Sequence, residues 1–252
     1  MTTFIKRLGE GTFAVVNLHK KNSDEDAFVV IKKLKTHHHY THANLMFKNE
    51  CRIIANLNHP NIRRLYDHTE YTMTLEYCPG IDIFEYLEAT ATKTASFDII
   101  NKYYFQLIDA VHYLHSKNIA HLDIKLENIM VDPETHKISL IDFGHAVDSK
   151  FVYKLGGTHP YIAPEGFYKN KIDPLKVDIW SLGVVLYEFI HGNFPWEYSN
   201  EIDDVFAQYA RTEKVHLKND IPENLCLILK GSLKLNPELR FTINDISNLK
   251  LT

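Results

Sequence analysis

Cysteine is scarce in this sequence, because its 252 residues include only Cys51, Cys78 and Cys226. An odd number of widely separated cysteines argues against a disulfide framework and indicates a reducing compartment. Long apolar runs are lacking as well. No stretch is long enough to span a bilayer, and residues 1–7 have no apolar core of a secretion signal. We therefore expect an intracellular protein, in the cytoplasm, the nucleus or both, with no membrane partner.

A large excess of charge of either sign is also missing. The chain has 28 Lys and Arg against 32 Asp and Glu, which gives a formal net charge of −4. This balance argues against a nucleic-acid partner. With 45% hydrophobic and 24% charged residues, the composition is ordinary for a globular protein that could form one large domain or two small lobes. No internal repeat or low-complexity segment is visible, and we expect a monomer.

What the sequence does contain is a polar loop, residues 121–128, between an apolar helix-like run and a short strand-like run. The loop carries Asp123, Lys125 and Asn128, and Asp142 follows at the end of the next apolar strand. A carboxylate that can orient a hydroxyl, a lysine, an amide and a second carboxylate suit phosphoryl transfer from Mg-ATP. Asn128 and Asp142 offer the hard oxygen ligands that Mg²⁺ prefers.

These motifs resemble the catalytic loop and the metal-binding motif of eukaryotic-type serine/threonine protein kinases. Further matches follow in the order of the family along nearly the whole chain. They are a Gly-x-Gly loop at 9–16, a strand ending in lysine at 28–32, a His-Pro-Asn break at 59–61, a hinge at 75–78, a Gly-Thr-x-x-Tyr-x-Ala-Pro-Glu segment at 157–165, an Asp-Ile-Trp-Ser-Leu-Gly segment at 178–183 and Pro-Glu-Leu-Arg at 237–240. The pattern is most similar to the calmodulin-dependent and AMP-activated kinase group.

The resemblance implies an α+β, bilobal fold. Residues 1–78 would form a small lobe with an antiparallel sheet and one main helix. Residues 79–252 would form a mainly helical lobe, with ATP between the two. A long apolar helix is expected to begin at Asp178, whose carboxylate would bond the backbone of the catalytic loop. Arg240 would pair with Glu165 in a structural ion pair.

The resemblance also implies roles for residues at matching positions. Asp123 would orient or deprotonate the acceptor hydroxyl, Lys125 would offset charge on the γ-phosphoryl group, and Thr158 would bridge the two. Asn128 and Asp142 would hold Mg²⁺. The positions that would contact the nucleotide, or orient those that do, are Leu8, Gly9, Gly11, Val16, Val30, Lys32, Glu50, Glu76, Cys78, Asp82 and Met130. The expected cofactors are ATP and Mg²⁺, and the expected partners are protein substrates with Ser or Thr.

Plain structural alternatives remain for several of these residues. Lys32 could be a charge at the end of a strand, and Glu50 could be a solvated charge on a helix. Asp82 could be a helix N-cap. Cys78 has no base placed beside it, which favours a packed hinge residue over a nucleophile. The histidine tract at 37–42 has a spacing that could bind zinc, but an exposed loop is the simpler interpretation.

Two departures from the family concern its phosphorylation switch. Leu122 occupies the position of the arginine that commonly binds a phosphorylated activation loop, and Lys154 occupies the usual phosphosite. Both halves of the switch are missing together, which predicts an active loop held by packing and by fixed charges. Ser149 and Tyr153 remain candidate phosphosites. A third departure, Leu126 in place of proline, has no direct chemical role.

The substrate preference is predicted from three acidic residues. Asp82, Glu127 and Glu188 match positions that bear carboxylates in kinases that prefer basic substrates, so we expect Arg or Lys two or three residues before the target hydroxyl. The alternative is that Glu127 and Glu188 are solvated surface charges.

Two rival functions stay open. A pseudokinase or ATP-binding scaffold would bind nucleotide or a partner without transfer, although Lys32, Asp123, Asn128 and Asp142 are all present. A small-molecule kinase of related fold is the other rival, and the segment at 157–165, which builds a peptide-docking surface in protein kinases, argues against it.

Overall fold

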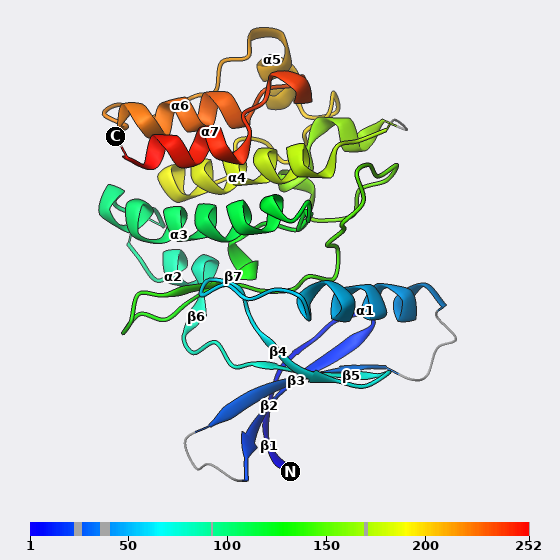
Figure 1. The fold of residues 1–252 in the computed structure, drawn as a ribbon. Helices are drawn as coiled ribbons and strands as arrows, with labels where there is room; N and C mark the ends of the chain where they lie inside the picture. The colour runs from blue at the N-terminus through cyan, green and yellow to red at the C-terminus, as the bar shows by residue number, and fades with distance from the viewer. Residues whose placement is uncertain (23–26, 36–40, 92, 169–170, 252) are drawn as a thin grey trace.

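The computed structural model describes residues 1–22, 27–35, 41–91, 93–168 and 171–251. A sheet-rich part built from the first third of the chain lies against a larger helical part (Figure 1). The histidine tract at 37–42 lies outside the residues whose side chains are described, so its metal binding stays a prediction. No helix in the described part of the chain is both long and apolar enough to cross a membrane.

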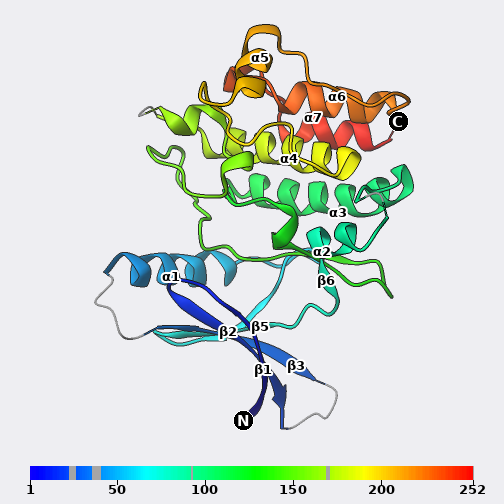
Figure 2. The same ribbon diagram turned by 180° about the vertical axis from the view of Figure 1, so that it is seen from behind.

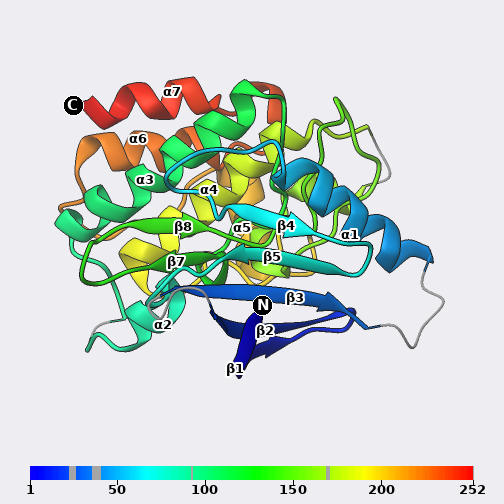
Figure 3. The ribbon, with the colours of Figure 1, turned by 60° about the horizontal axis from the view of Figure 1, so that its bottom comes forward.

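The smaller part is a five-stranded antiparallel sheet in the order β1-β2-β3-β5-β4. Its elements are β1 (Thr2–Glu10), β2 (Ala14–Lys21), β3 (Phe28–Leu34), β4 (Leu65–His68), β5 (Thr72–Glu76) and the helix α1 (Thr41–Ile54). The helix lies next to β4 (Figure 3). It buries Phe47, Cys51 and Ile54, which follow one another at helical spacing and face the sheet.

The larger part is mainly helical and has its own three-stranded sheet, in the order β6-β7-β8. Its elements are β6 (Ile81–Asp82), α2 (Ile83–Glu88), α3 (Phe97–Ser116), β7 (Ile129–Val131), β8 (Ile138–Leu140), α4 (Pro174–His191), α5 (Asp204–Thr212), α6 (Glu223–Ser232) and α7 (Ile243–Asn248). Short 3-10 turns cover Leu126–Asn128, His159–Tyr161, Pro164–Phe167, Pro237–Leu239 and Leu249–Leu251. Helices α3, α4, α6 and α7 stack in layers away from the five-stranded sheet (Figures 1 and 2).

Helix α4 is the centre of the larger part, and nearly all of its residues are buried. It begins at Pro174, about one turn before the predicted start at Asp178. The side chain of Asp173 caps the helix by accepting a hydrogen bond from the backbone N–H of Leu175. Aspartate at the N-cap and proline at the first helical position are a common start signal, so the earlier start was readable from the sequence. The helix ends at Gly192, whose φ of 73° suits a left-handed C-cap.

The observed arrangement confirms the predicted α+β fold, with an antiparallel sheet and one helix in the amino-terminal part and a mainly helical carboxy-terminal part. The boundary predicted after residue 78 falls in the segment between β5 and β6, and it stays a prediction. In the sheet register, Val16 on β2 pairs with Lys32 on β3, and β5 runs beside β3 into that segment. This geometry brings Lys32 to the side of the sheet that faces α1 and the loop after β8.

Candidate active site

Lys32 joins two elements of the candidate site. Its ammonium lies 2.8 Å from each carboxylate oxygen of Glu50 on α1 and 3.0 Å from Oδ1 of Asp142. Burial alone would lower the pKa of Lys32, but the two carboxylates raise it, so the ammonium stays charged. Lys32 is therefore not a strand-end surface charge, and Glu50, which is buried, is not a solvated one.

Asp142 lies just after β8 and presents a half-exposed carboxylate to the same space. Burial would raise its pKa, but the neighbouring Lys32 lowers it to about 2. The carboxylate is therefore an anion at any physiological pH. Its backbone is left-handed, with φ of 59°, which aims the side chain at Lys32 rather than into the core.

The two residues beside Asp142 anchor it to the larger part. Phe143 is fully buried, and its ring contacts that of His121 with centroids 4.8 Å apart. Burial lowers the pKa of His121, so the ring is neutral. A neutral ring can donate from Nε2 to the carbonyl of Ile141 at 3.1 Å while Nδ1 accepts from the backbone N–H of Asp123 at 3.3 Å. The ring thus links Asp123 to the segment that carries Asp142.

Four predicted residues converge at the catalytic loop. Nδ2 of Asn128 donates to the carbonyl and to Oδ2 of Asp123, at 2.8 Å each. Nζ of Lys125 lies 3.1 Å from Oδ2 of Asp123 and donates to Oγ1 of Thr158 at 3.0 Å. The prediction that Thr158 bridges the other two was wrong in this detail. Lys125 is the bridge, because its long chain reaches both oxygens while the threonine hydroxyl accepts from it.

Asp178 hydrogen-bonds the backbone of the catalytic loop, as predicted. Its buried carboxylate accepts from the backbone N–H groups of His121 and Leu122, both at 2.8 Å, and contacts Nε2 of His115 at 3.0 Å. Leu122 has a φ of 61°, which an L-residue rarely adopts without such support. The predicted pair of Arg240 and Glu165 is also confirmed, with two parallel contacts of 2.8 and 3.0 Å.

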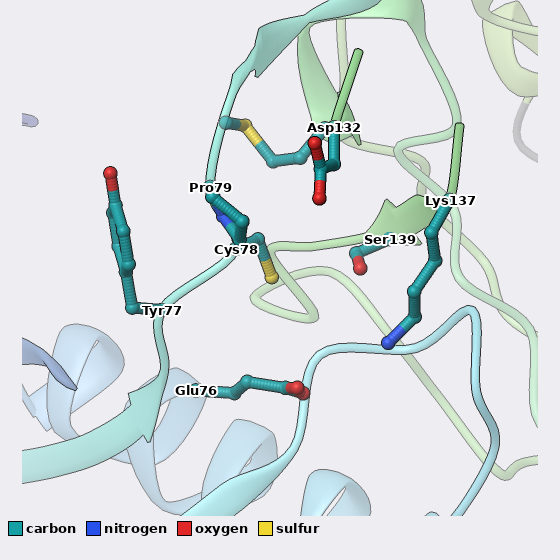
Figure 4. Close-up of a pocket in the computed structure, with 8 residues that line it drawn as sticks. Glu76, Tyr77, Cys78, Pro79, Asp132, Lys137 and Ser139 are labelled. Carbon is teal, nitrogen blue, oxygen red and sulfur yellow. The ribbon is translucent and has the colours of Figure 1, made fainter. Parts of the chain in front are cut away.

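The hinge between β5 and β6 supplies the edge where a nucleotide base is predicted to bind. Cys78 is buried there, which fits a packed hinge residue. Figure 4 shows a small cavity beside the hinge, with Glu76 and Lys137 extending toward each other. The cavity measures about 40 Å³, room for roughly three water molecules and not for a base. Of the other positions predicted to contact the base, Leu8 and Gly9 lie on β1, Gly11 in the turn after it, Val16 on β2, Val30 on β3 and Met130 on β7, and their contact with a base stays a prediction.

The three acidic residues behind the predicted substrate preference differ in environment. Asp82 is the N-cap of α2, because Oδ1 accepts the backbone N–H of Glu85 at 2.8 Å. Glu127 is exposed within the catalytic loop. Glu188 is only 4% exposed, and Oε2 accepts a 2.6 Å hydrogen bond from the hydroxyl of Tyr161. Glu188 is therefore not a solvated surface charge.

Two polar contacts near the site were missed at the sequence level. One is the pair of Tyr161 and Glu188, and the other is an ion pair of Arg52 with Asp148. Tyr161 belongs to a predicted motif, so a partner for its hydroxyl could have been sought on the long helix. Arg52 and Asp148 lie 96 residues apart outside any motif, and no sequence signal joins them.

Comparison with known proteins agrees with this geometry. Residues 2–251 match the protein kinase domain family. An Aurora kinase of Schizosaccharomyces pombe is 34% identical over 96% of the chain, CBL-interacting serine/threonine-protein kinase 12 of Arabidopsis thaliana 32% over 96%, and serine/threonine-protein kinase Nek8 of Danio rerio 30% over 96%. The chain spans 68%, 50% and 35% of the lengths of these relatives. Because the match extends over almost the whole chain, the chain belongs to the protein kinase family, as a protein kinase domain related to serine/threonine kinases.

Proposed function

We propose that this chain transfers the γ-phosphoryl group of ATP to Ser or Thr hydroxyls of protein substrates. We further propose that it prefers Arg or Lys upstream of the target and needs no phosphorylation of its activation loop. The observation that carries the proposal is the position of Lys32, bonded to both Glu50 and Asp142 while the polar loop converges on Asp123. Phosphates held by Lys32 would then lie between the metal-binding carboxylate and the acceptor hydroxyl.

The residues present fit a nucleotide with a divalent cation. Asp142 offers an anionic and partly exposed carboxylate, and Asn128 offers an amide oxygen from a side chain whose nitrogen already donates to Asp123. Oxygen donors of this kind suit Mg²⁺, and protein kinases use it with ATP. The bound cation would neutralise negative charge on the phosphates. Lys32 would grip the phosphates, with Glu50 fixing the direction of its ammonium.

The remaining side chains act on the acceptor. Asp123 would receive the proton of the Ser or Thr hydroxyl, and its carboxylate is oriented by Asn128. Lys125 would offset charge on the group in transfer, and its contact with Thr158 fixes its ammonium. These roles use positions that are already within hydrogen-bonding distance of each other, so little rearrangement is needed.

The proposed preference for basic substrates is supported by Glu127 and Glu188 more than by Asp82. One oxygen of Asp82 accepts the capping hydrogen bond of α2, whereas Glu127 is exposed within the catalytic loop. The charge of Glu127 also acts on Glu188, because it contributes to raising the pKa of Glu188. Two acidic groups close together would favour the planar, bidentate guanidinium of arginine over lysine.

The function is tested by measuring phosphate transfer from labelled ATP with Mg²⁺ to a generic basic protein, with Asp123→Asn as the matched control. We expect transfer by the wild type and a loss of at least about 10²-fold in the variant. Nucleotide binding without any transfer by the wild type would instead establish the pseudokinase alternative. Light scattering of the same sample tests the proposed monomer.

Substrate preference needs a separate experiment. A peptide library with each upstream position varied is run on the wild type, Glu127→Gln and the double variant Glu127→Gln/Glu188→Gln. We expect arginine two or three residues before the target to be preferred by the wild type and that preference to fall in the variants. An unchanged preference in the double variant would remove the specificity proposal and leave the transfer proposal standing.

A further inference from the structure

Helix α1 is joined to the segment after Asp142 by a bidentate ion pair. NH1 of Arg52 donates to Oδ2 of Asp148 at 2.6 Å, and NH2 donates to Oδ1 at 2.9 Å. Two parallel bonds between a guanidinium and a carboxylate fix the relative direction of both groups. Asn49 reinforces the contact from the preceding turn. Its Oδ1 accepts from NH2 of Arg52 at 2.8 Å, and its Nδ2 donates to the carbonyl of Ala146 at 2.9 Å.

The partners of this ion pair connect directly to the candidate active site. Arg52 follows Glu50 by two positions on α1, and Asp148 follows Asp142 by six. In the segment between Asp142 and Asp148, Val147 exchanges two backbone hydrogen bonds of 2.9 Å with Ala120, which precedes the catalytic loop. The contacts therefore close a ring from α1 through Asp148 and the catalytic loop to Asp142 and Lys32, and back to α1 through Glu50.

We propose that Arg52 and Asp148 are positioning residues for phosphoryl transfer. Their ion pair holds α1 against residues 146–148 and so keeps Glu50 on Lys32. This inference rests on the proposed function and deepens it, because it names a fixed charge that orders the loop where Leu122 and Lys154 replace the phosphate switch. A carboxylate, unlike a phosphate, is present without any modification, so the contact needs no other kinase to form it.

The loss of activity expected on removing the ion pair depends on how exposed its two side chains are. The side chains of Arg52 and Asp148 are 54% and 46% exposed. Isolated surface pairs contribute little, but bidentate geometry and a third partner raise the contribution. Salt screens exposed charges, so the advantage of the wild type over a neutral variant should shrink as ionic strength rises from about 0.05 to about 0.5 M.

The test compares Arg52→Gln, Asp148→Asn and the charge exchange Arg52→Glu/Asp148→Arg in the full chain. We expect each single variant to lower kcat roughly three- to tenfold, the size of a modest ion-pair loss, without changing KM for the peptide. The charge exchange should recover most of the loss. Lys48→Gln is the matched control, because Lys48 forms an exposed ion pair from the same helix to Glu70, between β4 and β5, and not to residues 146–148, and it should stay within about twofold of the wild type.

The proposal is overturned if the single variants match the wild type, if the charge exchange does not recover activity, or if Lys48→Gln loses as much. A wild type without any transfer contradicts the proposed function and not this pair. In that case the rate of amide hydrogen exchange in α1 tests whether the ion pair holds the helix. The exchange should be faster in Arg52→Gln and slow again in the charge exchange, and equal rates in all variants overturn the inference.

Discussion

At the scale of single residues, Leu122 and Asp142 share an unusual backbone. Their φ values of 61° and 59° lie in the left-handed region, which costs an L-residue about 1–2 kcal/mol. The strain is held by neighbours, because Asp178 bonds the N–H of Leu122 and Lys32 bonds the side chain of Asp142. Strain that surrounding contacts maintain is typical of functional sites, where it fixes the direction of a side chain.

The charge of Asp142 leads to the first prediction. Asp142→Asn keeps the shape of the side chain but removes the anion that Lys32 and a divalent cation both contact. We expect transfer to fall by roughly 10²-fold or more, while the melting temperature changes little because the side chain is half exposed. Transfer and thermal unfolding are measured on the same preparation with Mg²⁺ as the only metal. Near-normal turnover with an intact fold would contradict the role of Asp142.

Glu188 gives a prediction about pH. Burial and, to a smaller extent, the charge of Glu127 raise its pKa to about 8, although the hydrogen bond from Tyr161 acts in the opposite direction. Burial also raises the pKa of Tyr161, so its hydroxyl stays protonated and the carboxyl group is the one that titrates. At pH 7 only about a tenth of Glu188 is then ionised, and at pH 8.5 about three quarters.

Because arginine binds the ionised form, the advantage of an arginine peptide over a norleucine peptide should grow several-fold from about pH 7 to about pH 8.5. The ratio of the two kcat/KM values is measured, so effects common to both peptides cancel. In Glu188→Gln the ratio should stay flat. A ratio that rises equally in both proteins would assign the titration to another group, and one that is flat in both would exclude Glu188 from arginine recognition.

Residue-level prediction from sequence succeeded where a motif names both partners. Lys32 and Glu50 were paired on that basis, and so were Arg240 and Glu165. It failed where geometry decides, as with Lys125, whose length makes it the bridge between Asp123 and Thr158. It also could not foresee Arg52 with Asp148, because a contact across 96 residues depends on how α1 packs.

At the scale of elements, α4 is the support on which the catalytic loop rests. Its first turns are buried, and Asp178 projects from it to bond two successive backbone N–H groups of the loop. The helix was expected from the resemblance to protein kinases, but its start was placed a turn late because the Asp-Pro signal at Asp173 was not used. The buried residues of α4 explain why a helix forms here, and the N-cap at Asp173 explains where it begins.

This support can be tested with Asp178→Asn. The amide has one acceptor oxygen instead of two, so one backbone N–H of the loop would face the NH₂ group and remain without a bond in a buried site. We expect the free energy of unfolding to fall by about 1–3 kcal/mol and transfer to fall about tenfold or more, because Asp123 is displaced. Denaturant unfolding and the transfer assay measure the two effects.

Asp173→Asn is the control on the same helix, because asparagine caps helices about as well as aspartate, and it should change neither quantity much. Equal effects of both substitutions would show that α4 is sensitive to any loss of charge and that the bonds of Asp178 to the loop have no special role.

At the scale of the whole molecule, the amino-terminal and carboxy-terminal parts meet through polar connections at the candidate site and elsewhere, such as those of Asn61 with Ile138 and Leu140. Lys32 and Glu50 lie on the sheet side, and Asp142 and Asp148 lie in the segment that crosses between the parts. Both parts were expected from the resemblance to protein kinases that the ordered motifs carry. The way they are joined depends on the ring of contacts through Arg52, which only the three-dimensional arrangement reveals. We therefore expect assembly of the site to depend on this junction.

The state of that junction leads to the last prediction, which concerns the activation segment. Lys32 is paired with Glu50 and Asp142, and Phe143 is buried against His121. Leu122 is an apolar residue packed in the core, so it cannot bind a phosphate, and Lys154 is exposed and cannot accept one as Ser or Thr would.

We therefore expect phosphatase-treated protein, shown by mass spectrometry to have an unphosphorylated loop, to keep its transfer rate within about twofold of the untreated rate. A change of that size is typical of a surface alteration that leaves the ordered junction intact. Ser149→Ala and Tyr153→Phe should behave alike, because Tyr153 is largely exposed and neither side chain has a role in the ring of contacts. A large loss of rate on phosphatase treatment, reproduced by one of these two substitutions, would show that this residue orders the loop when phosphorylated and that the fixed charges are insufficient.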